Sequence, residues 1–378
     1  MFRIDLLPAE FGDAIWIEYG RRRKPHRLLI DCGTASVYPY LRQRLLALPE
    51  NDRHFELLVI THVDIDHIGG ALDLLRESAD LGVSFGEIWF NGHVHLTPGG
   101  VVSPLAVTDV RGPLQGEALT QLIVASGAQQ WNAALHGGAL VVPEAGQLRP
   151  LMRLPGGMWL TLLSPRQEQL DALRPAWEEA CRKAGILPDA PTRAAGPLLD
   201  EGEEPEEADD RPGDPDPERL AALPYKPDRA RPNGSSIALL AEYAGRRALF
   251  SGDAFAEVLL DSLTRLSGNT GGRYRLDACK LSHHGSRGNT SAELVQAVDC
   301  RNWLVSTNGK QFGHPNGEAI ARILRAAGGD VRLHFNYRSE FNEMWSSLAL
   351  QQQYGYSANY PAGEGAGLQL ELSPEHSG

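Results

Sequence analysis

The sequence has no apolar run long enough to cross a membrane. Its 378 residues contain no stretch of about eighteen consecutive apolar residues, the length that a transmembrane helix requires. Residues 1–7 have the pattern of a strand and lack the basic start and apolar stretch of a secretory signal. We therefore expect a globular protein without a membrane span, and a hydrophobic fraction of 42% is ordinary for such a chain.

Cysteine is also scarce. The four cysteines, Cys32, Cys181, Cys279 and Cys300, lie far apart and form no C-x-x-C pair. Small secreted proteins stapled by disulfides need denser cysteine patterns than this. The spacing favours a reducing compartment, and we expect a cytoplasmic protein.

Several catalytic signatures are missing. The sequence contains no G-x-S-x-G, no P-loop and no glycine fingerprint of a dinucleotide-binding fold. A nucleophilic serine, a phosphate-cradling loop and a dinucleotide cofactor therefore have no support from the sequence.

Negative charge is concentrated in one segment. Residues 200–218 hold eleven acidic residues and one basic residue, so they carry −10 of the formal charge of −12 and the rest of the chain carries −2. Residues 188–231 are rich in Pro, Asp and Glu, and we expect them to form a solvated, partly disordered insertion. The insertion is either a tolerated loop or a mimic of DNA that covers a cleft. The nearly neutral body leaves nucleic acid open as a partner.

A cluster of metal-ligand residues follows the apolar run at residues 55–60. Within residues 61–70, four such residues fall inside six positions, namely His62, Asp64, Asp66 and His67. A strand that ends in a tight H-x-D-x-D-H turn brings imidazole and carboxylate groups into one small volume. Zinc accepts both kinds of ligand, as do manganese and iron.

Further polar groups follow other predicted strands. Asp253 ends an S-G-D turn after an apolar strand, where a carboxylate can bridge two cations. His283 and His284 follow the next strand, His314 follows the strand after that, and Asp31 follows a strand near the start of the chain. All of these groups could gather at one edge of a sheet sandwich.

Taken in order, these motifs resemble the metallo-β-lactamase superfamily. The H-x-D-x-D-H turn is similar to the superfamily's H-x-[HD]-x-D-H signature, with Asp64 where many members have a histidine. The later motifs, N-x-S-S from Asn233, S-G-D, H-H-G-S and G-H-P, resemble the ComEC/Rec2-like branch and the phosphorylcholine esterases. The resemblance runs from Ile4 to about Leu372. It implies an α/β protein with an αββα four-layer sandwich and two divalent metal ions, zinc or manganese.

The resemblance also implies a ligand assignment. The strand at residues 158–163 supplies no mid-chain histidine, and in the phosphorylcholine esterase type later histidines complete the sites. The first metal would then take His62, Asp64, His283 and a bridging Asp253. The second would take Asp66, His67, His314 and the same Asp253. The sequence does not decide whether His283 or His284 is the ligand. We favour His283 because it ends the predicted strand.

The remaining site residues have supporting roles. We expect Asp66, Asp253 and His284 to act in catalysis, and Asp31 to orient a ligand by hydrogen bonding. Ser286 and Arg287 offer a hydroxyl and a guanidinium to a substrate phosphate.

Three other histidines compete for the metal. His93 and His95 have H-x-H spacing on a segment that we expect to be extended, and they either bind metal or line the cleft. His136, beside two glycines, is the alternative for the missing mid-chain ligand.

Short apolar segments alternate with helical ones in both halves of the chain. Predicted strands lie at residues 3–7, 14–19, 27–30, 57–60, 87–90, 159–163, 236–242, 247–250, 278–282, 303–306, 331–335 and 368–372. Predicted helices lie at residues 68–76, 116–126, 168–183, 256–266, 292–298 and 317–327. This pattern predicts two β-layers flanked by helices. We expect one hydrolase domain over residues 1–378, with a rim or lid insertion at 93–155 and the acidic insertion at 188–231.

Three functions are compatible with these observations. The favoured one is a metal-dependent phosphodiesterase or nuclease acting on DNA, RNA or a nucleotide, since two ions about 3.5–4 Å apart suit in-line displacement at phosphorus. The basic residues 21–24 and 246–247 would then contact phosphates. The second is a metallohydrolase of another ester, amide or lactone, such as a phosphocholine-type ester. The third is a non-catalytic scaffold that binds a partner protein in a multicomponent system.

Overall fold

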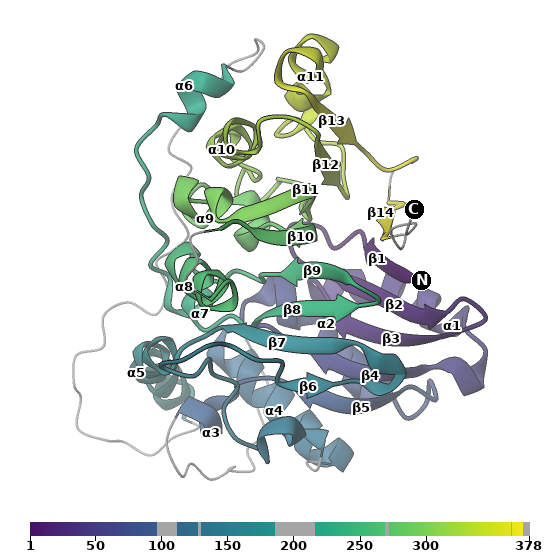
Figure 1. Ribbon diagram of the computed structural model, residues 1–378. Coiled ribbons are helices and arrows are strands. Elements are labelled where there is room, and N and C mark those ends of the chain that lie inside the picture. Colours follow the sequence, from purple (N-terminus) through teal and green to yellow (C-terminus); the bar gives the residue numbers. More distant parts are fainter. Residues whose placement is uncertain (97–111, 128–129, 186–215, 269–271, 364, 373–378) are drawn as a thin grey trace.

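Two β-sheets form the centre of the computed structural model (Figure 1), which describes residues 1–96, 112–127, 130–185, 216–268, 272–363 and 365–372. The first sheet has the strand order β14 (Leu368–Glu371), β1 (Phe2–Leu6), β2 (Ile15–Arg21), β3 (Lys24–Ile30), β4 (His54–Val59) and β5 (Ser84–Trp89). The second has the order β13 (Tyr356–Asn359), β12 (Val331–Phe335), β11 (Val298–Val305), β10 (Tyr274–Lys280), β9 (Arg246–Phe250), β8 (Ala238–Tyr243), β7 (Trp159–Ser164) and β6 (Met152–Arg153).

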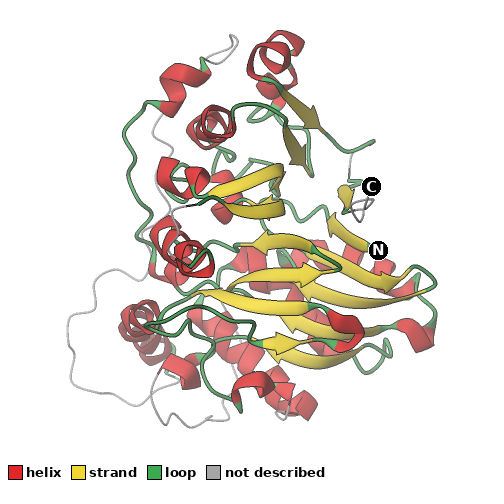
Figure 2. Ribbon diagram, viewed as in Figure 1, coloured by secondary structure: helices red, strands yellow, loops and turns green. Residues whose placement is uncertain are grey.

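Helices cover the outer faces of both sheets (Figure 2). Those packed on the first sheet are α1 (Tyr38–Leu46), α2 (Ile65–Glu77), α4 (Pro113–Gly127) and α5 (Gln167–Lys183). Those packed on the second are α8 (Ala256–Leu266), α9 (Ala292–Gln296) and α10 (Gly317–Ala327). The short helices are α3 (His93–Leu96), α6 (Pro217–Ala221), α7 (Arg231–Gly234) and α11 (Leu348–Tyr354). The result is the αββα sandwich that the sequence predicts.

The side chains of β2 explain why both faces of its sheet are covered, one by the other sheet and the other by helices. Ile15, Ile17 and Tyr19 belong to the core between the sheets, whereas Trp16 belongs to the core under the helices. Successive residues of a strand point to opposite faces, so a strand that is apolar at nearly every position must be covered on both faces.

The carboxyl ends of the parallel strands mark the edge of the sandwich at which a ligand site is expected. β3, β4 and β5 run parallel in the first sheet, and β9 to β13 run parallel in the second. In open α/β sheets, ligands bind beyond the carboxyl ends of such strands. The segments that carry Asp31, His62, Asp253, His284 and Ser306 all leave their strands at these ends.

Most predicted elements are present, with ends shifted by one to five residues. Helices 256–266 and 317–327 and strand 331–335 occur as predicted, and Ser291 caps α9 by accepting from the Leu294 N–H. The predictions missed the strands β6 and β13 and the helices α1, α3, α6, α7 and α11. The strand predicted at 278–282 ends at Lys280, and Ser282–Gly285 form a 3-10 turn. Among the described residues, no helix combines the length and apolar character that crossing a bilayer requires.

The acidic insertion needs a correction at its carboxyl end. Residues 186–215 lie outside the described part of the chain, but residues 216–231 are packed on the body. Asp216 caps α6 through its Oδ1 atom, and Leu220 is buried in the main core. The hydroxyl of Tyr225 donates to the carbonyl of Gly288 at 2.8 Å. These apolar and hydrogen-bonded anchors outweigh the composition from which we predicted disorder.

Candidate metal centre

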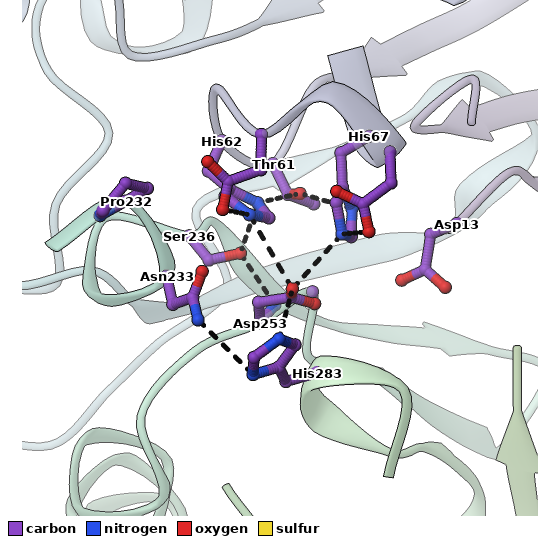
Figure 3. Close-up of polar contacts among 12 residues, drawn as sticks. Asp13, Thr61, His62, His67, Pro232, Asn233, Ser236, Asp253 and His283 are labelled. Carbon is purple, nitrogen blue, oxygen red and sulfur yellow. Dashed lines mark hydrogen bonds and ion pairs between the residues drawn. The ribbon is translucent and has the colours of Figure 1, made fainter. Parts of the chain in front are cut away.

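The candidate metal centre lies where both sheets end, and Asp253 is at its middle (Figure 3). His62 comes from the turn after β4, Asp253 from the turn after β9, and His284 from the turn after β10. His67 lies in the first turn of α2. Each of these four side chains is nearly inaccessible to solvent. Residues up to 222 positions apart therefore share one buried polar site.

Two glycines of the motif set the position of α2. A Cβ atom at Gly69 would lie 2.7 Å from the Ala35 backbone nitrogen, and one at Gly70 would lie 2.4 Å from the Cys32 carbonyl oxygen. Only glycine allows this approach. The approach brings the helix start against the turn that follows β3, which carries Asp31.

One group of donor atoms surrounds the space beside α2. The Nε2 atom of His67 lies 3.3 Å from Asp253 Oδ2 and 3.6 Å from Asp66 Oδ2. The Nε2 atom of His284 lies 3.2 Å from Asp66 Oδ2 and 3.7 Å from Asp253 Oδ2. Four residues thus direct one atom each into a common volume.

A second group shares the same Asp253 oxygen. The Nε2 atom of His62 lies 3.3 Å from Asp64 Oδ2 and 3.8 Å from Asp253 Oδ2. The Nε2 atom of His283 lies 3.9 Å from Asp253 Oδ2. Asp253 therefore belongs to both groups, and the donor groups that could hold a metal ion include His62, His67 and Asp253 as well as Asp66, His67 and His284.

The donor atoms fit divalent metal ions. The Nε2 atoms of His62, His67 and His284 and the Oδ1 atom of Asp253 are buried without any hydrogen-bond partner. Buried polar atoms are rarely left without one. Two ligands at about 2.1 Å from one tetrahedral ion are separated by about 3.4 Å, close to the nitrogen–oxygen distances in both groups. The mixture of imidazole and carboxylate suits zinc or manganese.

Hydrogen bonds hold each imidazole with its Nε2 atom toward the centre. The Nδ1 atom of His67 is 2.7 Å from Asp31 Oδ2, and that of His284 is 2.8 Å from the Ser306 carbonyl oxygen. Because these partners only accept, both Nδ1 atoms donate, which leaves Nε2 as the free lone pair. Such outer partners are usual for metal-binding histidines. Asp31 thus binds His67 on the side of the ring that faces away from the centre.

Charges in the centre are strongly coupled. Burial alone raises the pKa of Asp253, but His67, His284 and His283 hold it well below its usual range. Burial lowers the pKa of His67, yet Asp253, Asp66 and Asp31 raise it well above its usual value. The carboxylates are therefore ionised and attract positive charge, which a divalent cation can supply in place of protons.

Two residues of the centre escaped the sequence analysis. Lys280 is completely buried, and its ammonium forms an ion pair with Asp13, whose Oδ1 atom lies 3.5 Å from His284 Nδ1. Asp13 also joins Asp253 and His284 in one compact donor group. The available signal was a lysine at the end of an apolar strand and a Gly-Asp turn near the start of the chain.

A residue of the acidic segment also reaches the centre. Asp228 Oδ2 lies 3.5 Å from the Nδ1 atom of His283 and accepts from the amides of Asn233 and Asn289. The Nδ1 atom of His283 is also 3.1 Å from Asn289 Oδ1. Together with Asp253, these contacts raise the pKa of His283 to about 10, although burial opposes the charged form.

The reason for preferring His283 to His284 was wrong. Neither residue ends the strand, because both lie in the 3-10 turn after Lys280 with positive φ angles of 47° and 56°. This turn directs both imidazoles toward Asp253, with His284 buried and His283 partly exposed. His314 is buried next to them, and its ring centroid lies 5.1 Å from that of His283.

The competing histidines lie elsewhere. His95 is in helix α3 rather than on an extended segment, and its two ring nitrogens are engaged by the backbone of Gly92 and Gly137. His93 is also in α3, 3.9 Å from Glu178. His136 is exposed in a turn. The donor groups found among the described residues include none of these three.

The basic pairs do not border the centre. Residues 21–24 form the hairpin between β2 and β3, and residues 246–247 begin β9, so both lie at the strand ends opposite the metal centre. Arg246 instead pairs with Asp277 at 2.6 Å, and Arg247 with Glu242 at 2.8 Å. Contact of these basic residues with a phosphate stays a prediction, and it would involve a part of the substrate that lies away from the metal centre.

The two proposed substrate contacts are engaged within the protein. Ser286 is buried, and its hydroxyl accepts from the N–H of Gly288 at 3.1 Å. Arg287 pairs with Glu318 at 3.3 Å. A phosphate would have to compete with Glu318 for the guanidinium.

Comparisons with known proteins agree with the superfamily that the sequence motifs resemble. The profile of the Metallo-beta-lactamase superfamily matches residues 9–114. ComE operon protein 3 of Bacillus subtilis (strain 168) is 27% identical over 103 residues, which are 27% of this chain. The chain spans only 13% of the length of that relative.

Two solved structures are among those that the chain matches. One is the metallo-beta-lactamase fold protein YhfI from Bacillus subtilis, with a TM-score of 0.42 and 11% identity over 98% of this chain and 99% of that one. The other is a mutant of the CmlA beta-hydroxylase, with a TM-score of 0.37 and 14% identity over 97% of this chain and 54% of that one.

Proposed function

We propose, from the premise that this chain is a hydrolase of the metallo-β-lactamase superfamily, that it is a dinuclear-metal phosphodiesterase acting on nucleic acid or a nucleotide. The observation that carries the proposal is Asp253. Its Oδ2 atom lies within 3.9 Å of the Nε2 atoms of His62, His67, His283 and His284. A carboxylate with imidazoles on both sides is placed to bridge two ions.

The distances between donor atoms support the following ligand sets. His62, Asp64, His283 and Asp253 would hold one ion, and Asp66, His67, His284 and Asp253 the other. This assignment replaces His314 by His284 in the second set, because His284 Nε2 lies beside both carboxylates. His314 then borders the first set through its contact with His283.

Bound there, two divalent ions would activate water as a nucleophile and offset the charge of a phosphodiester. The chain's own contribution is positioning. Asp31 and the Ser306 carbonyl fix the tautomers of His67 and His284, so that no reorganisation is needed when substrate binds. The Nδ1 atom of His314 is buried without a hydrogen-bond partner, and burial with His283 and His284 nearby lowers the pKa of this imidazole well below its usual value.

The choice of a phosphodiester rests on analogy with the ComEC-like branch and on the suitability of paired ions for in-line displacement. A nucleic-acid substrate, a partner protein of a multicomponent system and a cytoplasmic location belong to the same proposal. A phosphocholine-type ester is the competing substrate.

Metal analysis and a substrate screen test the proposal together. We expect about two zinc or manganese ions per chain in protein prepared without chelator. We also expect metal-dependent cleavage of DNA, RNA or bis(p-nitrophenyl) phosphate. Asp66→Ala should lose an ion and activity, whereas Asp73→Ala, on the exposed side of α2, should keep both. Metal-loaded protein that cleaves only a phosphocholine ester would move the assignment to that class.

A further inference from the structure

An apolar rim, defined here as Phe11, Ile65 and Phe312, borders the metal centre. Ile65 lies inside the H-x-D-x-D-H turn and is 43% exposed, and Phe312 is 37% exposed. Phe312 lies two positions before His314, and the two ring centroids are 6.1 Å apart. Single exposed apolar residues are common on protein surfaces, but here they adjoin a buried cluster of histidines and aspartates.

The rim residues belong to turns that pack together. The rings of Phe11 and Phe312 meet edge to face, with centroids 5.9 Å apart. The N–H of Asp13 donates to the Asp66 carbonyl at 3.1 Å, so the turn that carries Phe11 lies against the turn that carries Ile65. The three rim residues therefore come from neighbouring segments, and the two phenylalanine rings are in contact.

The loop that presents Phe312 is held in place. The N–H of Asn308 donates to the Glu10 carbonyl at 2.7 Å. Gly309 lies so close to Phe341 that a Cβ atom would come within 2.2 Å of that ring. A fixed apolar surface loses little conformational entropy when a flat ligand covers it, and the covered area leaves water.

Charge beside the rim favours a neutral ring with an attached phosphate over a cationic headgroup. Lys310 is exposed two positions before Phe312 and would attract a phosphate and repel a cation. The carboxylate of Glu10 is engaged by the hydroxyls of Thr34 and Ser36, both at 2.8 Å. Aromatic side chains beside basic ones are the recurrent means of binding single-stranded nucleic acid.

We propose that the apolar rim stacks an unpaired nucleobase next to the scissile phosphodiester. The substrate is then single-stranded nucleic acid or a nucleotide, because paired bases in a duplex do not present a free face. The inference rests on the proposed function, which puts the phosphodiester at the metal centre. It adds that the site selects substrates with an unpaired base.

Two matched esters test the selection. Thymidine 5′-(p-nitrophenyl) phosphate and methyl p-nitrophenyl phosphate release the same leaving group, but only the first carries a base. We expect the wild type to have a kcat/KM about tenfold higher for the thymidine ester, as one stacked base would provide. Phe312→Ala should abolish the preference and Phe312→Tyr should retain it. Leu348→Ala, which removes a 73% exposed side chain from α11, is the control.

Binding supplies a second readout without turnover. Labelled oligothymidylate with phosphorothioate linkages should bind the metal-loaded wild type more tightly than the same oligomer without bases or than a duplex. If thymidine monophosphate binds more weakly than the oligomer, the substrate is a single-stranded polynucleotide. If the two bind equally, the substrate is a nucleotide.

Several outcomes would overturn the inference. Equal kcat/KM for the two esters in the wild type, or equal behaviour of Phe312→Ala and Leu348→Ala, would remove the stacking role. A preference for p-nitrophenylphosphorylcholine that Phe312→Ala abolishes would show that the rim selects a cation. If no phosphodiester is cleaved, the proposed function fails, and the oligomer binding alone decides whether the rim binds bases.

Discussion

The ammonium of Lys280 and the carboxylate of Asp13 form an ion pair that is sealed from solvent beside the metal centre. Lys280 also donates to the carbonyl of Gly252, 3.3 Å away, in the turn that presents Asp253. Burial alone raises the pKa of Asp13, but Lys280 and His284 hold it well below its usual range. The centre thus contains a lysine ammonium group of its own.

The Lys280 ammonium offsets part of the negative charge that the carboxylates bring to the metal centre. Six carboxylates lie in or beside the centre, namely Asp13, Asp31, Asp64, Asp66, Asp228 and Asp253. Two divalent ions and Lys280 would together offset five of these six negative charges. A buried charge that loses its partner costs about 3–5 kcal/mol.

Lys280→Met should therefore lower the free energy of unfolding by about 3–5 kcal/mol and weaken metal binding, because Asp13 keeps a buried unpaired charge. The double variant Lys280→Met with Asp13→Asn should recover most of the loss. Urea titrations of metal-free and metal-loaded protein measure both effects. Lys183→Met, at a side chain that is 69% exposed, is the control, and an equal effect in the control would refute the prediction.

The histidine variants discriminate between the ligand assignments. His283→Ala and His284→Ala should each reduce the metal content from about two ions per chain toward one, because each removes a donor from one set. Elemental analysis after removal of free metal measures this, with the exposed His136→Ala as the control. If His314→Ala loses an ion and His284→Ala keeps both, the assignment of His314 as a ligand is restored.

Deletion of residues 200–215 should preserve the fold and metal binding. The deletion stops before Asp216, since this residue caps α6 and Leu220 anchors α6 in the core. A deletion that extends to residue 221 should lower the melting temperature, which thermal unfolding followed by circular dichroism can detect. If the segment mimics DNA, the shorter deletion would also raise nuclease activity, most clearly at low salt.

Two histidines outside the centre should control stability in mild acid. Burial lowers the pKa of His95 to about 4, and burial with Arg332 nearby lowers that of His334 to about 4. An unfolded histidine titrates near 6.5, so between about pH 6.5 and 4 the unfolded chain binds protons that the folded chain excludes. The free energy of unfolding should fall over this window by up to about 3 kcal/mol for each.

His334→Gln should flatten this dependence. In the wild type the Nε2 atom of His334 donates to Asn302 Oδ1 at 3.1 Å, a bond that a glutamine amide can also make. Chemical denaturation at several pH values would measure the slope. An unchanged slope in the variant would show that His334 contributes nothing to acid sensitivity, and His54→Gln, at an exposed histidine, should leave the slope unaltered.

The sequence alone was sufficient to predict the layers of the fold and several residues of the metal centre. Alternating or continuous apolar segments indicate burial locally, so the strands between residues 3 and 335, apart from the two-residue β6, could be recognised without knowing what they contact. The turn containing His62 and His67 is equally local, because all its donors lie within six positions. Asp253 was recognisable because it follows directly on a buried strand.

Tertiary structure decided what depends on residues distant in sequence or on unusual backbone angles. His283 and His284 both face Asp253 because of positive φ angles that packing imposes and that propensity does not reveal. Lys280 meets Asp13 only after the two sheets pack, across 267 positions of the chain. Residues 216–231 have the composition of a solvated loop, yet packing of Leu220 orders them, because burial of a few anchors outweighs local composition.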